Sequence, residues 1–246
     1  MYIWAIVLLS ALAIISSYTL HTFPLALISA IIASGIMEIL IRKYYLKHAF
    51  KIPYSGLITG LIIGSVVPIN APILLIIIAS LIAVASKFFI QYKSTNIFNP
   101  ATLGMIAALP LFGLGDEWWV ASNYNIYGIA ITLTPVLIIL AYEARRLPTA
   151  ISFVVVSFFL YIITNASQLS LATAVSILFS INFFFAFVML IEPKTSPHNN
   201  YAQLAYGASL AVLYLVFAYL GLAYPLLIVL LVGNLSYLLY RKYGKR

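Results

Sequence analysis

Residues 68–72 read Pro-Ile-Asn-Ala-Pro, and residues 193–197, which lie 125 positions further along, read Pro-Lys-Thr-Ser-Pro. The same offset carries Pro100 onto Pro225. Three prolines that recur at one offset indicate an internal duplication. The repeat therefore predicts two halves in which the same elements follow one another in the same order.

The composition indicates an integral membrane protein. Hydrophobic residues make up 64% of the 246 positions, charged residues make up 7%, and the mean hydropathy is +1.11. A soluble domain carries about a quarter charged residues and could not bury so much apolar surface. The absence of cysteine from the sequence excludes disulfides and thiolate-bound metals on this chain, and three scattered histidines do not favour a metal site.

Apolar runs separated by charged, proline-rich or asparagine-rich gaps predict about ten membrane-spanning helices. The fold class that we expect is therefore an all-α polytopic membrane protein. The first run carries no signal-peptide features, so we expect it to be retained. The predicted spans cover residues 2–20, 23–41, 52–68, 71–90, 99–113, 126–142, 148–165, 170–190, 201–220 and 223–240.

Charged residues are distributed unevenly among the gaps between the predicted spans. All 13 lysines and arginines fall after even-numbered predicted spans, whereas the gap after the fifth span carries Asp116 and Glu117. Basic residues mark the cytoplasmic side, so we expect a multi-pass protein of the cell membrane with both termini in the cytoplasm. Because the basic residues are dispersed among these gaps, the net charge of +8 does not predict nucleic-acid binding.

The 125-residue offset also carries each of the first five predicted spans onto one of the last five. We therefore expect a first repeat at residues 1–113 and a second at 126–246, both within a single membrane domain. An odd number of spans per repeat gives the two copies opposite orientations, as in many transporters, where functional groups lie at broken helices near the midplane. The expected site lies around the two proline turns and the Pro100 region.

Polar side chains concentrate where the predicted fifth span begins. Residues 94–102 read Ser-Thr-Asn-Ile-Phe-Asn-Pro-Ala-Thr. Asn99 before Pro100 fits an N-terminal cap, with proline at the first helical position. Capping alone explains Asn99, but Asn96, Asn99 and Thr102 together also suit an anionic or polar ligand at a positive helix end.

A second polar turn follows the predicted eighth span, where residues 190–198 read Leu-Ile-Glu-Pro-Lys-Thr-Ser-Pro-His. A carboxylate near the bilayer is costly unless it is paired or hydrated, so Glu192 is a candidate for binding, together with Thr195 and Ser196. An ion pair of Glu192 with Lys194 or His198 is the alternative. Elsewhere, the spacing of Glu38 to Arg42 and of Glu143 to Arg146 predicts simple ion pairs along helices.

Small residues line the predicted third span, residues 52–68. Gly56, Gly60 and Gly64 recur every four positions, which allows close approach of another helix or of a flat ligand. Helix packing is the simpler interpretation, and Ser55 and Thr59 could bond nearby carbonyls. These five residues are expected to serve packing or a transport pathway.

Three stretches resemble the NqrB/RnfD family, the membrane subunits of ion-translocating electron-transport complexes: residues 53–60, 94–102 and 192–197. The resemblance implies a ten-helix inverted repeat related to the urea-transporter fold and partner subunits of a redox complex. It also implies that Asn96, Asn99, Thr102, Glu192, Thr195 and Ser196 bind a cofactor. Glu192 stands where the family usually has aspartate.

The resemblance bears on cofactors as well. Typical family members carry FMN on a threonine of a Ser-Gly-Ala-Thr motif before the sixth helix, and some hold riboflavin. The nearest counterpart here, residues 127–130, reads Tyr-Gly-Ile-Ala and has no hydroxyl at its last position, and Thr132 has the wrong neighbours. Covalent FMN is therefore not expected, and FMN or riboflavin would be held non-covalently.

Three functions follow from the sequence. The first is a short RnfD-like subunit that couples electron flow to cation movement, at most a non-catalytic or flavin-binding part of a membrane oxidoreductase. The second is a stand-alone transporter or channel for a flavin or small solute, and the third is a structural anchor. No P-loop, dinucleotide fingerprint, serine nucleophile elbow or zinc-protease helix occurs in the sequence.

Overall fold

The computed structural model describes residues 2–122 and 127–244, and all of their side chains except 122–133, 136 and 168. It divides into two compact units, Met1–Ser122 and Asn123–Arg246. The division lies in the segment between the two predicted halves, and the predicted start of the second half, residue 126, lies outside the described residues. Each unit is described below by itself.

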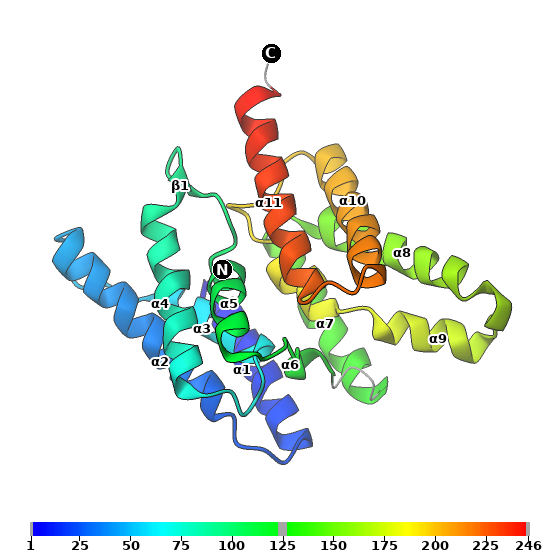
Figure 1. Cartoon of the computed structure of the whole chain (residues 1–246), viewed down its shortest axis with the longest axis horizontal. Helices are drawn as coiled ribbons and strands as arrows, with labels where there is room; N and C mark the ends of the chain where they lie inside the picture. The colour runs from blue at the N-terminus through cyan, green and yellow to red at the C-terminus, as the bar shows by residue number, and fades with distance from the viewer. Residues whose placement is uncertain (1, 123–126, 245–246) are drawn as a thin grey trace. The chain divides into compact units, whose positions relative to one another are not determined.

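Unit 1 is helical apart from one short hairpin (Figure 1). A π-helical turn, Ile41–Tyr45, directly continues α2, and a 3₁₀ turn, Leu109–Phe112, continues α5. Strands β1 and β2 pair antiparallel between α4 and α5. The elements are α1 (Tyr2–Thr19), α2 (Leu25–Leu40), α3 (Tyr54–Val66), α4 (Ile73–Phe89), β1 (Gln91–Tyr92), β2 (Thr95–Asn96), α5 (Pro100–Ala108) and α6 (Trp119–Ser122).

The core of unit 1 depends on the close approach of α3 to α2. A Cβ atom added at Gly60 would lie 2.5 Å from the carbonyl oxygen of Ala30, and one added at Gly64 would lie 2.4 Å from the Cα of Leu27. Both neighbouring atoms belong to the backbone of α2, so they could move away only if the helix itself shifted. Small residues therefore let the two helix backbones touch, as is common between membrane helices.

The end of α3 is fixed by the segment that leads into α6. The backbone amides of Glu117 and Trp118 both donate to the carbonyl of Val66, and the indole of Trp119 donates to the carbonyl of Gly64 at 2.7 Å. In return, the carboxylate of Glu117 accepts from the amide of Ile69 at 3.1 Å. The carbonyls of Gly64 and Val66, which lie in the last turn of α3, thereby gain partners outside the helix.

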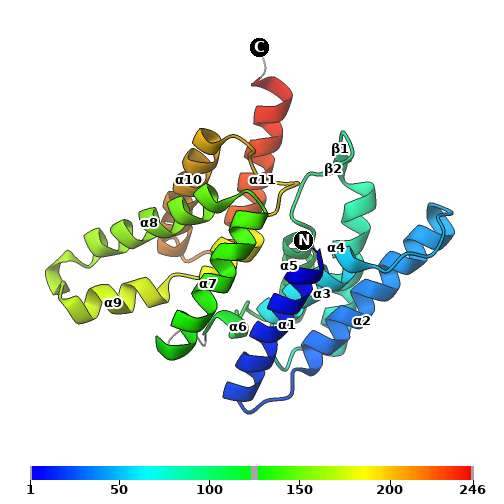
Figure 2. The same ribbon diagram turned by 180° about the vertical axis from the view of Figure 1, so that it is seen from behind.

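Unit 2 is also helical, and Figure 2 shows its helices from behind. A single 3₁₀ turn, Ala166–Gln168, joins α8 to α9, and a π-helical turn, Phe185–Met189, precedes the second proline turn. The α-helices are α7 (Tyr127–Glu143), α8 (Leu147–Thr164), α9 (Leu171–Ser180), α10 (Asn200–Tyr219) and α11 (Pro225–Tyr243).

The predicted continuous span over residues 170–190 is wrong, because the helix breaks at Ile181 and Asn182. α9 ends where Ile181 turns extended, and the side chain of Asn182 accepts a hydrogen bond from the amide of Phe185 at 2.8 Å. This bond caps a new helical segment. Hydropathy could not reveal the break, since both segments are apolar.

Within residues 2–122 and 127–244, five helices are long and apolar enough to cross a membrane, which indicates a multi-pass membrane protein. They cover Tyr2–Thr19, Leu25–Tyr45, Leu147–Thr164, Asn200–Tyr219 and Pro225–Tyr243. Other apolar helices are shorter, and α3 spans only about 20 Å at 1.5 Å per residue, which is less than a hydrocarbon core of about 30 Å. Such helices need flanking segments to complete a crossing.

Replacing Gly60 by alanine is expected to destabilise unit 1 by about 1–3 kcal/mol, because the added methyl group meets the α2 backbone. The thermal unfolding midpoint of the purified chain in detergent measures the effect. Gly115→Ala is the matched control, since a Cβ there meets nothing within 4 Å. Equal midpoints for the two variants would contradict the close packing of α3 on α2.

Candidate functional site

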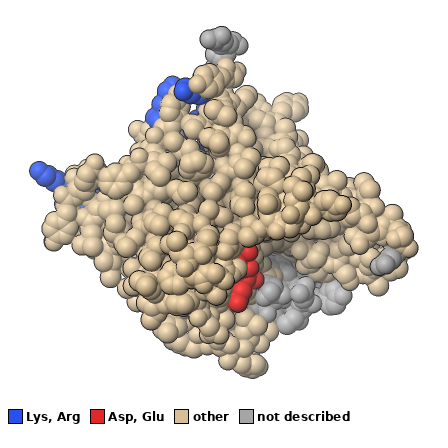
Figure 3. Space-filling view, viewed as in Figure 1, with Lys and Arg blue, Asp and Glu red and all other residues tan. Residues whose placement is uncertain are grey.

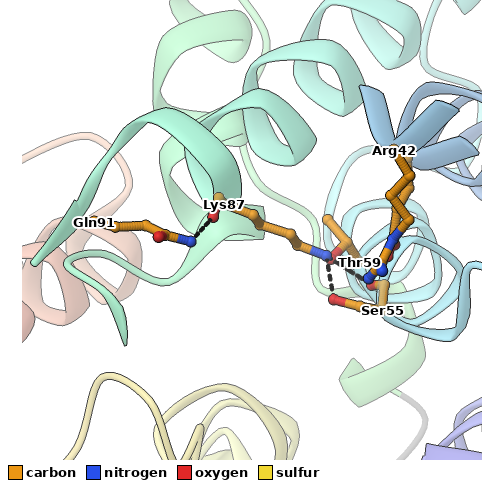
Figure 4. Close-up of polar contacts among 6 residues, drawn as sticks. Arg42, Ser55, Thr59, Lys87 and Gln91 are labelled. Carbon is orange, nitrogen blue, oxygen red and sulfur yellow. Dashed lines mark hydrogen bonds and ion pairs between the residues drawn. The ribbon is translucent and has the colours of Figure 1, made fainter. Parts of the chain in front are cut away.

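An ion pair lies at the C-terminal end of α2 in unit 1, between Glu38 of α2 and Arg42 of the π-helical turn that follows it (Figure 4). Arg42 donates from Nε and Nη2 to Oε1 of Glu38 at 2.8 and 2.6 Å. The predicted pairing of these two residues is confirmed. The side chain of Glu38 is only 1% exposed and that of Arg42 is 32% exposed, so the carboxylate is buried while the guanidinium is partly exposed.

Lys87 adds a buried positive charge. It lies in the last turn of α4 and donates from Nζ to the carbonyl and the hydroxyl of Ser55, at 2.7 and 2.8 Å. The side chain of Gln91 donates to the Lys87 carbonyl. In the sequence Lys87 is one of the basic residues that mark the end of the predicted fourth span, but in the structure it is buried, because it continues the face of α4 formed by Ala79 and Ala83.

The beginning of α3 connects Lys87 to the ion pair. Thr59 donates to the Ser55 carbonyl at 2.9 Å, so that oxygen accepts from both Thr59 and Lys87. A Cβ atom on Gly56 would lie 2.8 Å from Oε2 of Glu38 and 2.7 Å from the carbonyl of Ser34. Among the described atoms, Oε2 of Glu38 and Oγ of Ser34 are buried without a hydrogen-bond partner. Oε2 of Glu38, which accepts no hydrogen bond from a described atom, therefore lies where α3 packs on α2.

The polar string at the start of α5 is largely satisfied by its own backbone. Oδ1 of Asn99 accepts from the amide and the hydroxyl of Thr102, both at 3.1 Å, which caps α5. Asn96 lies in β2 opposite Gln91. Its Oδ1 is buried, and no described atom donates to it. Of these three predicted ligand residues, Asn96 alone offers a buried acceptor without a partner.

In unit 2, the second proline turn is held by Arg146, which is 2% exposed. Its guanidinium donates to the hydroxyl of Ser196 at 3.0 Å and to the carbonyl of Pro193 at 3.2 Å. The predicted pairing of Arg146 with Glu143 is wrong, because the side chain reaches across to this turn instead. The hydroxyl of Ser196 also donates to the carbonyl of Glu192 at 2.7 Å. Ser196 therefore links Arg146 to the beginning of the turn.

Further bonds fix Glu192 and Thr195. The hydroxyl of Thr195 donates to Oε2 of Glu192 at 3.3 Å, and Nδ2 of Asn234 on α11 donates to the Thr195 carbonyl at 3.3 Å. Thr195 and Ser196 are both buried. These residues close the turn, and the contacts described for them are with neighbouring protein groups.

His198 contacts Arg146 rather than Glu192, contrary to one predicted pairing. Its Nδ1 lies 2.7 Å from Nη2 of Arg146, so it accepts a hydrogen bond from the guanidinium. Burial, and after it the charges of Arg146 and Arg241, lower the pKa of His198. The turn thus favours the neutral imidazole.

Gln203 completes this side of unit 2. Its side-chain amide donates to the carbonyls of Arg145 and His198, both at 3.0 Å. The sequence arguments missed Gln203, Asn234 and Lys87, although each interrupts an otherwise apolar run. A polar residue inside a predicted span is the signal that could have identified them.

No protein-family model matches the chain, and no curated protein matches its sequence. The residues expected to hold a flavin fit one poorly, because Asn99, Thr102, Thr195 and Ser196 bond to their own turn or helix. The side chains of residues 127–130, the counterpart of the covalent attachment motif, lie outside the described residues.

The Glu38–Arg42 pair should respond unequally to removal of its two members. Arg42→Gln leaves a buried carboxylate without its partner and is expected to cost about 2–4 kcal/mol in the free energy of unfolding. Glu38→Gln costs less, because Arg42 can turn toward solvent. Denaturant titration of the purified variants measures both values, and the double variant should recover part of the Arg42→Gln loss. Equal losses for the two single variants would contradict the asymmetric burial.

The lowered pKa of His198 predicts a pH dependence. The unfolded chain binds the proton more tightly than the folded one, so stability falls as the pH drops below the ordinary histidine value near 6.5. Thermal midpoints between pH 7.5 and 5 measure this loss, and it should be smaller for His198→Gln. His48→Gln serves as the control in the other unit. An equal pH response of wild type and His198→Gln would show that His198 does not titrate in this way.

Proposed function

We propose that the chain is an integral membrane subunit of an NqrB/RnfD-like electron-transport complex, in which it helps couple electron flow to cation movement across the cell membrane. The observation that carries the cation part is the burial of two charged side chains, Glu38, which pairs with Arg42, and Lys87, beside neighbouring residues of α3. The electron-transport part rests on the resemblance of residues 53–60, 94–102 and 192–197. The proposal does not require a covalently bound flavin.

Charged side chains inside an apolar unit are the main support. Ionisable groups within membrane helices are costly, and they usually face one another on an ion or proton path. Glu38 and Lys87 meet this description, since they approach adjacent residues of α3, Gly56 and Ser55. A carboxylate oxygen with unused capacity, Oε2 of Glu38, provides a place where a proton or cation can be held.

The proposed topology has ten spans in two inverted repeats, with both termini in the cytoplasm, and one contact within each unit supports its alternating crossings. In unit 1, the acidic gap after the fifth predicted span bonds to the gap after the third, through Glu117 and Ile69. In unit 2, Arg146 after the sixth span bonds to Ser196 after the eighth. In each unit the contact joins segments that follow two odd-numbered or two even-numbered predicted spans. Such segments lie on the same side of the membrane if every span crosses it.

A stand-alone transporter or channel is the second candidate, and the break at Ile181 and Asn182 favours it. Discontinuous helices recur in transporters, where their ends form the substrate site. Such a protein would move a flavin or a small solute without partner subunits. The two candidates therefore differ in whether the purified chain is active alone.

The test begins with the full-length chain purified from its native membrane in mild detergent. Redox subunits should copurify with it, and any flavin absorbance should leave with the small-molecule fraction on denaturation. In membrane vesicles, Glu38→Gln should reduce electron-driven cation uptake at least tenfold, whereas Glu143→Gln, which alters an exposed carboxylate, should not.

Equal uptake by these two variants would overturn the role of Glu38. Solute uptake by the chain alone in proteoliposomes, with no copurifying redox subunit, would favour the transporter. Flavin that stays on the denatured chain would contradict the expectation of non-covalent binding.

A further inference from the structure

The end of α2 in unit 1 carries a basic cavity, and Arg42 of the ion pair with Glu38 forms part of its lining. Its volume is about 350 Å³, and its lining includes Arg42, Lys43, His48 and Lys51 together with the ring of Phe50. This volume is within the range of sites that bind small ligands. In Figure 3, basic side chains form the blue surface at the end of α2.

The backbone builds this cavity. The π-helical turn ends as the amide of Leu46 donates to the carbonyl of Ile41 at 3.0 Å. Lys47 then takes a left-handed conformation with φ of 54°, and the amide of His48 donates back to the carbonyl of Arg42 at 3.0 Å. The chain therefore doubles back on the helix end, which brings His48 and Lys51 beside Arg42 and Lys43.

The charge in this cavity is poorly balanced. Arg42 pairs with Glu38, but the other acidic residues of unit 1, Asp116 and Glu117, belong to the segment before α6, where Glu117 contacts Ile69. Lys43 and Lys51 are exposed. The lining of the cavity therefore carries positively charged side chains that attract an anion.

Apolar rings surround the same place. Tyr44, Tyr45 and Phe50 are 68%, 63% and 76% exposed. α2 and its π-helical continuation form one of the five helices long enough to cross a membrane, so these rings lie at its end. Exposed aromatic residues and cations at the end of a membrane helix are typical of the headgroup region.

We propose that this cavity binds the phosphate headgroup of an anionic phospholipid. Lys43, Lys51 and His48 contact the phosphodiester, and Phe50 with the neighbouring tyrosines lies among the upper acyl chains. Basic pockets at the cytoplasmic ends of membrane helices bind anionic headgroups in this way. The site requires only that α2 crosses the membrane, so it does not depend on the proposed role in electron transport.

Native mass spectrometry of the full-length chain in neutral detergent, titrated with phosphatidylglycerol or phosphatidylcholine, tests the proposal. Phosphatidylglycerol should bind more tightly. Each basic residue near a headgroup contributes about 1 kcal/mol, so Lys43→Gln with Lys51→Gln should weaken phosphatidylglycerol binding about thirtyfold at low salt. Lys47→Gln is the matched control, because it removes the same charge from the same segment outside the cavity lining, and it should change affinity less than fivefold.

Equal affinity for the two lipids would overturn the proposal, as would an equal loss in Lys47→Gln and the double variant. Inorganic phosphate that competes at the same concentration as phosphatidylglycerol would show a general anion site and not a lipid site. Thermal midpoints of the variants should match that of wild type, because the substituted side chains are exposed. Lost lipid binding at an unchanged midpoint therefore assigns the effect to the cavity.

Discussion

Charged side chains enclosed by apolar helices need partners inside the protein, and this requirement organises both units. In unit 1 the most demanding groups are Glu38 and Lys87. Arg42, in the π-helical turn after α2, pairs with Glu38, and the carbonyl and hydroxyl of Ser55 at the start of α3 accept hydrogen bonds from Lys87. The glycines of α3 bring its backbone against α2, with Gly56 next to the carboxylate of Glu38. Close packing of α3 and the pairing of both buried charges therefore occur in the same place.

Unit 2 meets the same requirement by another route. There the buried cation is Arg146, and its partners are neutral oxygens of the second proline turn and the ring of His198, without a carboxylate among its described contacts. A guanidinium has five donors in a fixed plane and suits such a set of acceptors. The two proline turns that look alike in sequence thus have different surroundings. The turn Pro193–Pro197 binds the guanidinium of Arg146, whereas in the turn that follows Pro68 the amide of Ile69 donates to the carboxylate of Glu117.

The sequence predicted the class of fold and the composition of its elements better than their interruptions. Apolar runs and the pairing of Glu38 with Arg42 follow from local spacing, which a sequence displays directly. The break at Asn182 follows from a local cap that hydropathy does not display, whereas the burial of Lys87 depends on which face of α4 meets α3, and that is decided by residues distant in the chain. Arg146 is the clearest case. Glu143 is its nearest acid in sequence, yet the turn fifty residues later offers more acceptors.

The bonds that hold the end of α3 also bear on the order in which the chain assembles during synthesis. α3 leaves the ribosome some fifty residues before Glu117, Trp118 and Trp119, whose amides, carboxylate and indole complete its C-terminal end. Until those residues are made, the carbonyls of Gly64 and Val66 lack the partners that they have in the folded chain. The C-terminal end of α3 is therefore completed only after Glu117, Trp118 and Trp119 have been synthesised.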